Sequence, residues 1–132
     1  MVSYILILKL EKDKIIKVGA LGKLNFKKGF YMYVGSAKSS IKRIERHFRT
    51  DKKLRWHIDY LSVNADVLNT IVFSAKEVLE CHLANILSQH FEGTKNFGCS
   101  DCECYSHLFF SEKNPIEKLA KLFENYNFRF YK

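Results

Sequence analysis

The sequence predicts an α+β domain, and three observations lead to this class. Residues 3–11 and 67–73 are rich in branched aliphatic side chains, and residues 29–35 carry aromatic side chains at alternate positions, as β-strands do. Residues 76–90 place apolar side chains at helical spacing. The predicted strands and helices do not alternate strictly along the chain, which favours a layered α+β arrangement over a parallel α/β one.

The length and composition fit one domain. The chain of 132 residues contains 47% hydrophobic and 14% aromatic residues, with 6 glycines and 1 proline. One core can therefore form across residues 1–132, and no linker, repeat or low-complexity tract divides it. No apolar run approaches the roughly 20 residues that span a bilayer, and the apolar run at residues 4–8 is too short for a signal-peptide core. We therefore expect a cytoplasmic protein that does not enter membranes.

The first part of the chain predicts a hairpin, a loop and a third strand. A charged turn at residues 11–14 joins the strand over residues 3–11 to a second, β-branched strand over residues 14–20. Glycines punctuate the loop at residues 19–23, and the third strand, GFYMYVG, follows at residues 29–35. The strand period of two divides its side chains between two faces. One face carries Tyr31, Tyr33 and Gly35, and the other carries Phe30, Met32 and Val34.

Two short helices are predicted next. Ser39 or Ser40 is a suitable N-cap for a helix that runs through Ile41 to about Arg49, with basic residues on its outer face. The WHIDYL segment at residues 56–61 fits a short buried helix, although a strand also fits. Its aromatic residues Trp56 and Tyr60 are expected in the core, and Asp59 is expected to orient a helix N-terminus or a histidine. His57 and Asp59 do not share a helical face, so they make a poor catalytic pair.

The remaining elements follow from apolar spacing and proline. The apolar stripe of the helix over residues 76–90 comprises Val78, Leu79, Leu83, Ile86 and Leu87 and continues to Phe91. After it we expect a Gly- and Cys-rich loop over residues 93–107, a strand over residues 108–110, a helix from Pro115 at position N1 to Phe123, and an edge strand over residues 128–131.

The positive charge points to a polyanionic partner. Basic residues number 22 against 14 acidic ones, giving a net charge of +8 and an isoelectric point near 9.3. A solvated, lysine-rich surface is one interpretation, but the basic residues cluster after residues 29–35, which favours nucleic acid. The residues predicted to contact it are Lys42, Arg46, Arg49, Lys52 and Lys53.

Residues 33–47 can bring together groups that suit phosphate chemistry. Tyr33 ends a strand and Gly35 permits a close turn. Arg43 then lies two turns into the next helix, with His47 one turn further on the same face. The arginine fork suits a phosphate that gains charge in a transition state, and a hydrogen-bonded tyrosine can relay a proton from water. The alternative is that these tyrosines only pack against the sheet.

Several motifs together resemble a known nuclease superfamily. The run YVGSA-x-x-x-I-x-R-x-x-x-H at residues 33–47 is similar to the second motif and following helix of the GIY-YIG nucleases. The combination of GFYMYVGSA, RIERH, WHIDYL, the Glu80-Cys81 pair and SDCECYSHL more closely resembles one branch of that superfamily, catalogued as domain of unknown function 123. The resemblance covers residues 3–110. Members of this branch occur in archaea and bacteria, alone or joined to endonuclease III.

The resemblance implies a fold and an active site. The implied fold is a small antiparallel sheet of three core strands flanked by helices, with a Mg²⁺-dependent phosphodiester hydrolysis site on the sheet. Matched by position, Tyr33 is the tyrosine of the second motif, Arg43 stabilises the phosphate, and Glu80 is the acidic metal ligand. His47 and Tyr4 would complete the site.

The first motif of the superfamily must lie outside the GFYMYVG strand. The two motif tyrosines come from neighbouring strands, whereas Tyr31 and Tyr33 share a face of one strand. The first motif is therefore placed at Val2-Ser3-Tyr4, where the usual glycine and isoleucine are replaced. An extra hairpin lengthens the gap between Tyr4 and Tyr33 relative to the superfamily.

The implied function is a Mg²⁺- or Mn²⁺-dependent endonuclease acting in DNA repair. In it, the metal on Glu80 binds the scissile phosphate, Tyr4 or Tyr33 helps to deprotonate water, and Arg43 offsets the developing charge. The alternative is a nucleic-acid-binding module that has lost turnover, with or without a stabilising zinc ion. The resemblance favours DNA over RNA as the partner. The oligomeric state is open, and a dimer that cuts both strands of DNA is one option.

A second metal prediction concerns the Cys-rich loop. Cys99, Cys102, Cys104 and His107 offer the thiolate and imidazole ligands that zinc prefers, and Cys81 can approach from the preceding helix. The spacing is not that of paired C-x-x-C knuckles, so reduced and simply packed cysteines are the alternative interpretation.

Overall fold

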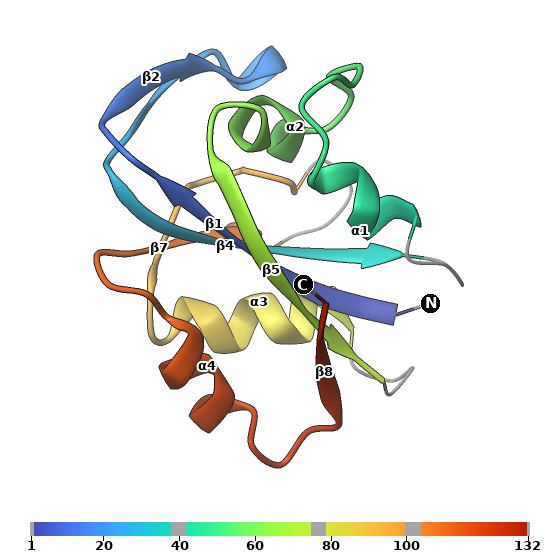
Figure 1. Cartoon of the computed structure of the whole chain (residues 1–132). Helices are drawn as coiled ribbons and strands as arrows, with labels where there is room; N and C mark the ends of the chain where they lie inside the picture. Colours follow the sequence, from blue (N-terminus) through green and yellow to red (C-terminus); the bar gives the residue numbers. More distant parts are fainter. Residues whose placement is uncertain (1, 38–41, 75–78, 100–103, 132) are drawn as a thin grey trace.

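A computed structural model, which describes residues 2–37, 42–74, 79–99 and 104–131, shows one large antiparallel sheet between layers of helices (Figure 1). Among the described residues the strand order of this six-stranded sheet is β6-β7-β4-β1-β5-β8, while β2 and β3 form a separate two-stranded sheet. The strands are β1 (Val2–Leu10), β2 (Lys14–Lys17), β3 (Lys23–Phe26), β4 (Gly29–Ala37), β5 (Asp66–Phe73), β6 (Glu92–Gly93), β7 (Leu108–Ser111) and β8 (Phe128–Tyr131). The α+β class is confirmed, and the sheet is larger than the three strands predicted.

Four α-helices are described, and none of them combines the length and apolar character needed to cross a membrane. They are α1 (Lys42–His47), α2 (His57–Ser62), α3 (Glu80–Ser88) and α4 (Ile116–Leu122), with a short 3₁₀ turn at Gly19–Leu21.

The strand β1 lies at the centre of the sheet. It pairs with β4 along its whole length, from Val2 opposite Ala37 to Leu10 opposite Gly29, and its other edge pairs with β5. The side chains at residues 4–8 are at most 1% exposed. A strand covered on both faces needs an apolar side chain at every position, which explains the uninterrupted YILIL run.

Helices and the β2–β3 hairpin divide the two faces of the sheet between them (Figure 1). On one face, Ile44 of α1 and Phe26 of β3 belong to the same buried cluster as Leu6 of β1. On the other face, Leu83 of α3 packs with Ile5 of β1, and α4 joins the same cluster. Successive residues of β1 therefore serve different cores, as the strand period requires.

The predicted hairpin between the first two strands is wrong. β2 pairs with β3, from Lys14 opposite Phe26 to Lys17 opposite Lys23, and not with β1. The reason is that both edges of β1 are occupied, by β4 on one side and β5 on the other. The β2–β3 hairpin instead folds over one face of the sheet, where Phe26 is buried.

Several predicted helix boundaries shift. In the described residues α3 begins at Glu80, because Leu79 has extended N-cap geometry and is 62% exposed, so Leu79 does not belong to the buried stripe. α1 ends at His47, and Pro115 is the N-cap of α4 instead of its first helical residue. The predicted N-caps Ser39 and Ser40, together with Ile41 and residues 76–78, lie outside the described residues.

Candidate functional site

A pocket of about 430 Å³ lies where the pairing between β4 and β7 ends. The ladder stops at Tyr33 opposite Leu108, so side chains from both faces of the sheet can meet beside the last residues of β4. The pocket is lined by Tyr4, Tyr33, Gly35, Ser36, Arg43, His47, Arg55, Trp56, His57, Glu80, Gly98 and His107. All five residues predicted for catalysis, which are Tyr4, Tyr33, Arg43, His47 and Glu80, are among them.

Gly35 makes room for Tyr4. The two residues lie opposite each other in the β1–β4 ladder, and a Cβ atom at Gly35 would lie only 2.6 Å from both Cζ and Oη of Tyr4. The tyrosine ring therefore lies across the glycine, and its hydroxyl group forms a 2.7 Å hydrogen bond with Nε2 of His47. By contrast, Tyr31 does not line the pocket, because its hydroxyl group donates to the carbonyl oxygen of Lys27 at 2.7 Å.

Burial sets the protonation states of the tyrosines and the histidine. Burial, followed by the neighbouring Tyr33, raises the pKa of Tyr4 well above its usual value. Burial, followed by the charge of Glu80, likewise raises the pKa of Tyr33. For His47, burial and then the positive charge of Lys52 lower the pKa to about 3. At pH 7 both tyrosines are protonated and His47 is neutral. The Tyr4 hydroxyl therefore donates to Nε2 in one tautomer of His47, and Nε2–H donates to the Tyr4 oxygen in the other.

Arg43 is held at the rim of the pocket by two contacts. Its Nη1 donates to the carbonyl oxygen of Ser36 at 2.6 Å, and its guanidinium carbon lies 4.7 Å from the centre of the Trp56 ring. In the part of the chain that the structure describes, Arg43 forms no ion pair with a carboxylate. Arg43 therefore presents a net positive charge to the pocket.

Trp56 is exposed at the site and is not in the core, contrary to the prediction. It is 36% exposed, and the guanidinium groups of both Arg43 and Arg46 lie within 4.7 Å of its ring centre. Such cation–π stacking is favourable for an indole ring. The segment WHIDYL therefore supplies a platform for arginine, a role that apolar spacing alone does not reveal.

Asp59 holds Arg46 and the backbone at Trp56 in place. Its buried carboxylate accepts hydrogen bonds from Arg46 at 2.7 and 3.0 Å and from the backbone N–H groups of Arg55 and Trp56 at 2.8 and 2.9 Å. Burial raises the pKa of Asp59, but these hydrogen bonds and the charge of Arg46 outweigh it, so the pKa lies below its usual value. The expectation that Asp59 orients a helix N-terminus is confirmed, since it caps the start of α2.

Two residues predicted to contact nucleic acid are held inside this network. The side chain of Lys52 is 3% exposed, and its ammonium group donates to Ser62 Oγ at 2.7 Å. Arg46 is paired with Asp59 as described. Apolar and charge patterns in the sequence do not distinguish a buried lysine from an exposed one, which explains the difference.

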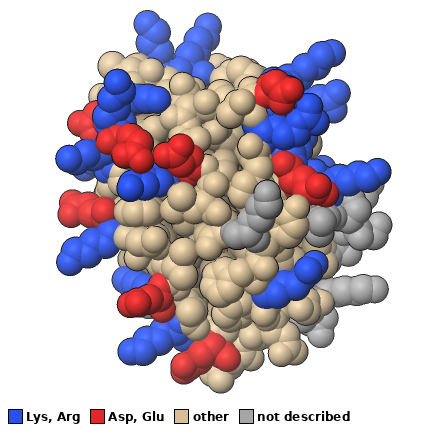
Figure 2. Space-filling view, in the orientation of Figure 1, with Lys and Arg blue, Asp and Glu red and all other residues tan. Residues whose placement is uncertain are grey.

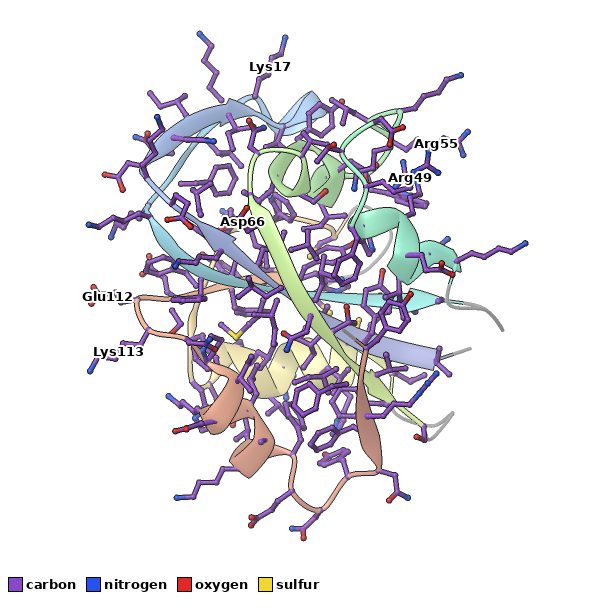
Figure 3. All side chains as sticks on the ribbon, in the orientation of Figure 1. Lys17, Arg49, Arg55, Asp66, Glu112 and Lys113 are labelled. Carbon is purple, nitrogen blue, oxygen red and sulfur yellow. The ribbon has the colours of Figure 1, made fainter. Side chains whose placement is uncertain are left out.

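The other predicted contact residues stay on the surface. Lys42, Arg49 and Lys53 are exposed, as is Arg55. Figure 2 shows basic side chains gathered on the side of the molecule where α1 and its connection to α2 lie, and Figure 3 shows that the labelled Arg49 and Arg55 point outward there. The basic surface and the pocket therefore lie on the same side of the fold.

The pocket is also lined by Glu80 of α3 and by His107, which directly precedes β7. Glu80 is the first residue of α3, and its side chain is 39% exposed. Its Oε2 lies 3.9 Å from Nδ1 of His107, whose side chain is 3% exposed. Among the described residues Glu80 supplies the only carboxylate that lines the pocket, and it is therefore the residue there with an oxygen ligand suited to Mg²⁺.

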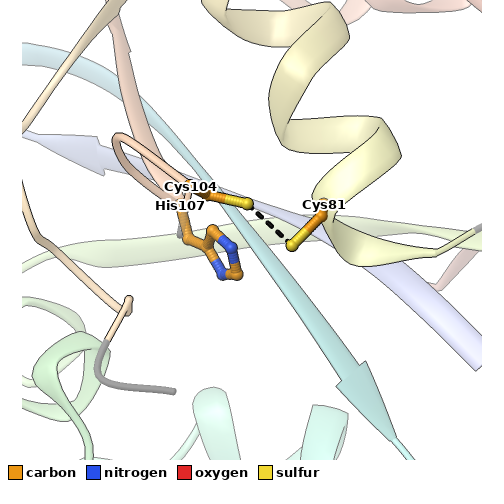
Figure 4. Close-up of side chains that lie close together, drawn as sticks. All are labelled: Cys81, Cys104 and His107. Atoms are coloured by element: carbon orange, nitrogen blue, oxygen red, sulfur yellow. Dashed lines mark hydrogen bonds between the residues drawn. The ribbon is translucent and has the colours of Figure 1, made fainter. Parts of the chain in front are cut away.

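A second group of metal-ligating atoms lies next to Glu80 (Figure 4). One ligand atom each of Cys81, Cys104 and His107 lies within 4.8 Å of the other two, so this group can hold a metal ion. The predicted ligand Cys99 is not in the group, because its Sγ points to the carbonyl oxygen of Phe97 at 3.4 Å. The predicted ligand Cys102 lies outside the described residues.

The pocket lining also includes Arg55, His57 and Gly98, which were not predicted for the site. Arg55 follows the basic run of the sequence, and His57 accepts a 2.8 Å hydrogen bond at Nδ1 from the backbone N–H of Gly98. A Cβ atom at Gly98, where φ is +74°, would lie 3.1 Å from His107 and 3.2 Å from Tyr33. Gly98 therefore lets the backbone of the Cys-rich loop approach both residues closely. A glycine in this loop is the feature of the sequence that could have indicated such an approach.

Comparison with known proteins identifies a family but no characterised relative. No curated protein and no solved structure matches the chain. One family model does match, over residues 3–128, which is nearly the whole chain, and its description is "Domain of unknown function DUF123". The chain therefore belongs to the family described as domain of unknown function DUF123.

Proposed function

We propose that this protein is a Mg²⁺-dependent endonuclease of the GIY-YIG type that hydrolyses phosphodiester bonds in nucleic acid, DNA in preference to RNA. The observation that carries the proposal is the convergence of Tyr4, Tyr33, Arg43, His47 and Glu80 in one pocket. These residues come from β1, β4, α1 and α3, elements up to 76 positions apart, and simple core packing gives no reason for an exposed arginine and a glutamate to meet there.

The pocket suits a hydrated magnesium ion. Mg²⁺ prefers oxygen ligands and commonly binds through one or two carboxylates while it keeps several waters. Six waters at about 30 Å³ each occupy about 180 Å³, and the pocket of about 430 Å³ leaves further room for a phosphate group. Glu80 would hold the ion, which when bound supplies Lewis-acid stabilisation of charge on the phosphate oxygens.

Arg43 would stabilise the charge that develops on the phosphate. Its guanidinium group has five N–H donors, and Ser36 takes one of them. The stacking on Trp56 fixes the plane of the fork. A guanidinium that is already oriented needs little reorganisation when the phosphate gains charge, which is the condition for strong transition-state stabilisation.

Tyr4 and His47 would carry the proton of the attacking water. As the water oxygen attacks phosphorus, the P–O bond to the leaving sugar oxygen would break, and that oxygen would take a proton from solvent. The Tyr4 oxygen would take the proton of the attacking water and pass its own proton across the 2.7 Å hydrogen bond to Nε2 of His47. His47 is neutral at pH 7, so its Nε2 atom has a lone pair for this proton, although the burial that lowers its pKa to about 3 opposes the imidazolium. The negative charge of the bound phosphate favours the imidazolium that results.

Cleavage of supercoiled plasmid and of branched DNA, with and without Mg²⁺, tests the proposal. We expect Mg²⁺-dependent cleavage by the wild-type protein, and a loss of about 10²–10³-fold in rate for Arg43→Ala, the usual cost of one transition-state donor. Arg129→Ala is the matched control, because Arg129 is an exposed arginine of β8 that neither lines the pocket nor belongs to the predicted nucleic-acid contacts.

Binding measured in parallel separates the two candidate functions. Glu80→Gln should abolish cleavage while salt-dependent binding of DNA persists. If the wild type and Arg43→Ala are equally inert on every substrate but both bind DNA, the endonuclease proposal is wrong and the protein is a nucleic-acid-binding module.

A further inference from the structure

We propose that Cys81, Cys104 and His107 form a binding site for Zn²⁺ that joins the start of α3 to the loop before β7. One ligand atom from each residue lies within 4.8 Å of the others, and the two Sγ atoms are 2.7 Å apart. The residues come from segments 23 or more positions apart along the chain (Figure 4). The proposal holds whether or not the protein cleaves nucleic acid.

The donor atoms select the class of ion. Two thiolates and one imidazole are the soft and intermediate ligands that Zn²⁺ prefers, whereas Mg²⁺ and Ca²⁺ require oxygen ligands. Cys81 lies in the first turn of the nine-residue helix α3, where the helix dipole favours an anionic side chain. This site is therefore chemically distinct from the oxygen ligand that Glu80 offers to the pocket.

The geometry needs only a small adjustment to hold the ion. Tetrahedral Zn²⁺ with Zn–S bonds of about 2.3 Å separates its two sulfur atoms by about 3.8 Å, which is about 1 Å more than their present separation of 2.7 Å. Cys81 is exposed, so its side chain can rotate by this amount. His107 is held firmly, because its backbone N–H donates to Phe97 at 2.9 Å and its carbonyl oxygen accepts from Val34 at 2.8 Å.

A zinc ion here would position the pocket residues that adjoin it. Cys81 follows Glu80 directly in α3, and His107 lines the pocket while it contributes a ligand. Residues next to zinc ligands are oriented by the ion, and loss of such an ion commonly loosens the surrounding chain. We therefore expect the zinc to stabilise the placement of Glu80 as well as the fold of the loop.

Cys99 provides a matched control for the ligand set. It belongs to the same Cys-rich loop, and sequence spacing alone names it as a ligand. Its Sγ atom instead points to the carbonyl oxygen of Phe97. Cys99→Ser should therefore leave zinc binding unchanged, whereas Cys81→Ser or Cys104→Ser should remove a ligand.

Zinc content and cobalt substitution test the site. The protein is purified under reducing conditions without chelators, and metal is measured in the wild type and in the Cys81→Ser, Cys104→Ser, His107→Asn and Cys99→Ser variants. We expect about one equivalent of zinc in the wild type and in Cys99→Ser, with at least a tenfold lower affinity in the other three. Titration of metal-free wild type with Co²⁺ should give thiolate-to-cobalt charge-transfer absorption, a readout that does not depend on any variant folding.

Three results would overturn the proposal. The first is wild-type protein that contains less than about half an equivalent of zinc and shows no charge-transfer absorption with Co²⁺. The second is a Cys99→Ser variant that loses the metal as completely as Cys81→Ser, which would replace the proposed ligand set. The third is a Cys81–Cys104 disulfide, identified by peptide mapping, with no bound metal in protein kept reduced throughout.

Discussion

The substitution Gly35→Ala should damage both the stability and the site of this protein through a single steric contact. The new Cβ would lie 2.6 Å from Cζ and Oη of Tyr4, whereas carbon atoms pack at about 3.5–4.0 Å. The Tyr4 ring must therefore move by about 1 Å, although it is 1% exposed and has little space to move into. Overpacking of this kind costs about 1–3 kcal/mol.

The shift of the ring also breaks its polar contact. The Tyr4–His47 hydrogen bond is 2.7 Å long and buried, and the loss of a buried partner costs about 1–3 kcal/mol more. We expect the free energy of unfolding, measured by urea denaturation, to fall by about 2–6 kcal/mol in Gly35→Ala. If the endonuclease proposal holds, the cleavage rate should fall as well, since the same contact orients the Tyr4 hydroxyl.

A double-mutant cycle isolates the cause. In a Tyr4→Leu background the tip of the ring and its hydrogen bond are gone, so Gly35→Ala should cost little, and the coupling between the two positions should be about 2–6 kcal/mol. Equal costs of Gly35→Ala in both backgrounds would show that the glycine is needed for its backbone and not for the room it gives Tyr4, which would refute this reasoning.

Three further substitutions test the buried charges. Burial and then Lys52 lower the pKa of His47 from 6.5 to about 3, so between these pH values the unfolded chain binds a proton at His47 and the folded chain does not. As pH falls through this range, the free energy of unfolding should drop by about 1.4 kcal/mol per pH unit. His47→Asn should lack this part of the pH dependence. Lys52→Ala should lower the denaturation midpoint without a matching loss at the exposed neighbour Lys53→Ala, which should weaken DNA binding only. Asp59→Asn should cost about 3–5 kcal/mol by denaturation, whereas Asp51→Asn, with a side chain 84% exposed, should be nearly neutral.

The strands and the long helix could be predicted from local pattern. The alternation in GFYMYVG assigned Tyr31, Tyr33 and Gly35 to one face of β4, and the structure places Tyr31 and Tyr33 in the cluster on that face. This assignment, combined with the resemblance to a superfamily whose motif tyrosines come from neighbouring strands, led to Tyr4 as the partner of Tyr33. Tyr4 lies in the pocket while Tyr31 does not. Period and turn chemistry are local properties, so one sequence suffices to read them.

Strand pairing could not be predicted in this way. Whether β2 pairs with β1 or with β3 depends on which strands occupy the edges of β1, and β5 is more than 50 positions further along the chain. For the metal-ligating group, the sequence named Cys81, Cys104 and His107, but it also named Cys99, which the assembled fold leaves outside the group. Cys81 and Cys104 meet because α3 and the loop before β7 are packed together, whereas the C-x-x-C spacing drew attention to Cys99.

The usual burial of a residue type also misled the prediction at Trp56 and Lys52. Tryptophan is usually buried, yet Trp56 stays partly exposed because both of its neighbours Arg43 and Arg46 stack on it. Lysine is usually exposed, yet Lys52 is enclosed because Ser62 and Asp59 satisfy its ammonium group. In both cases the partners are not adjacent to the residue in the sequence, so only the assembled fold shows these contacts.

The unbroken ladder between β1 and β4 allows the β2–β3 hairpin, which connects these two strands, to change in evolution without changing the site. Tyr4 and Gly35 face each other near one end of the ladder, and the β2–β3 hairpin is inserted beyond the other end, where Leu10 faces Gly29. Six residue steps of about 3.3 Å put roughly 20 Å between the two ends. Insertions and deletions in the hairpin can thus accumulate during evolution while the register at Tyr4 stays fixed. Divergent relatives are therefore better recognised by which residues pair across the two strands than by the number of residues between them.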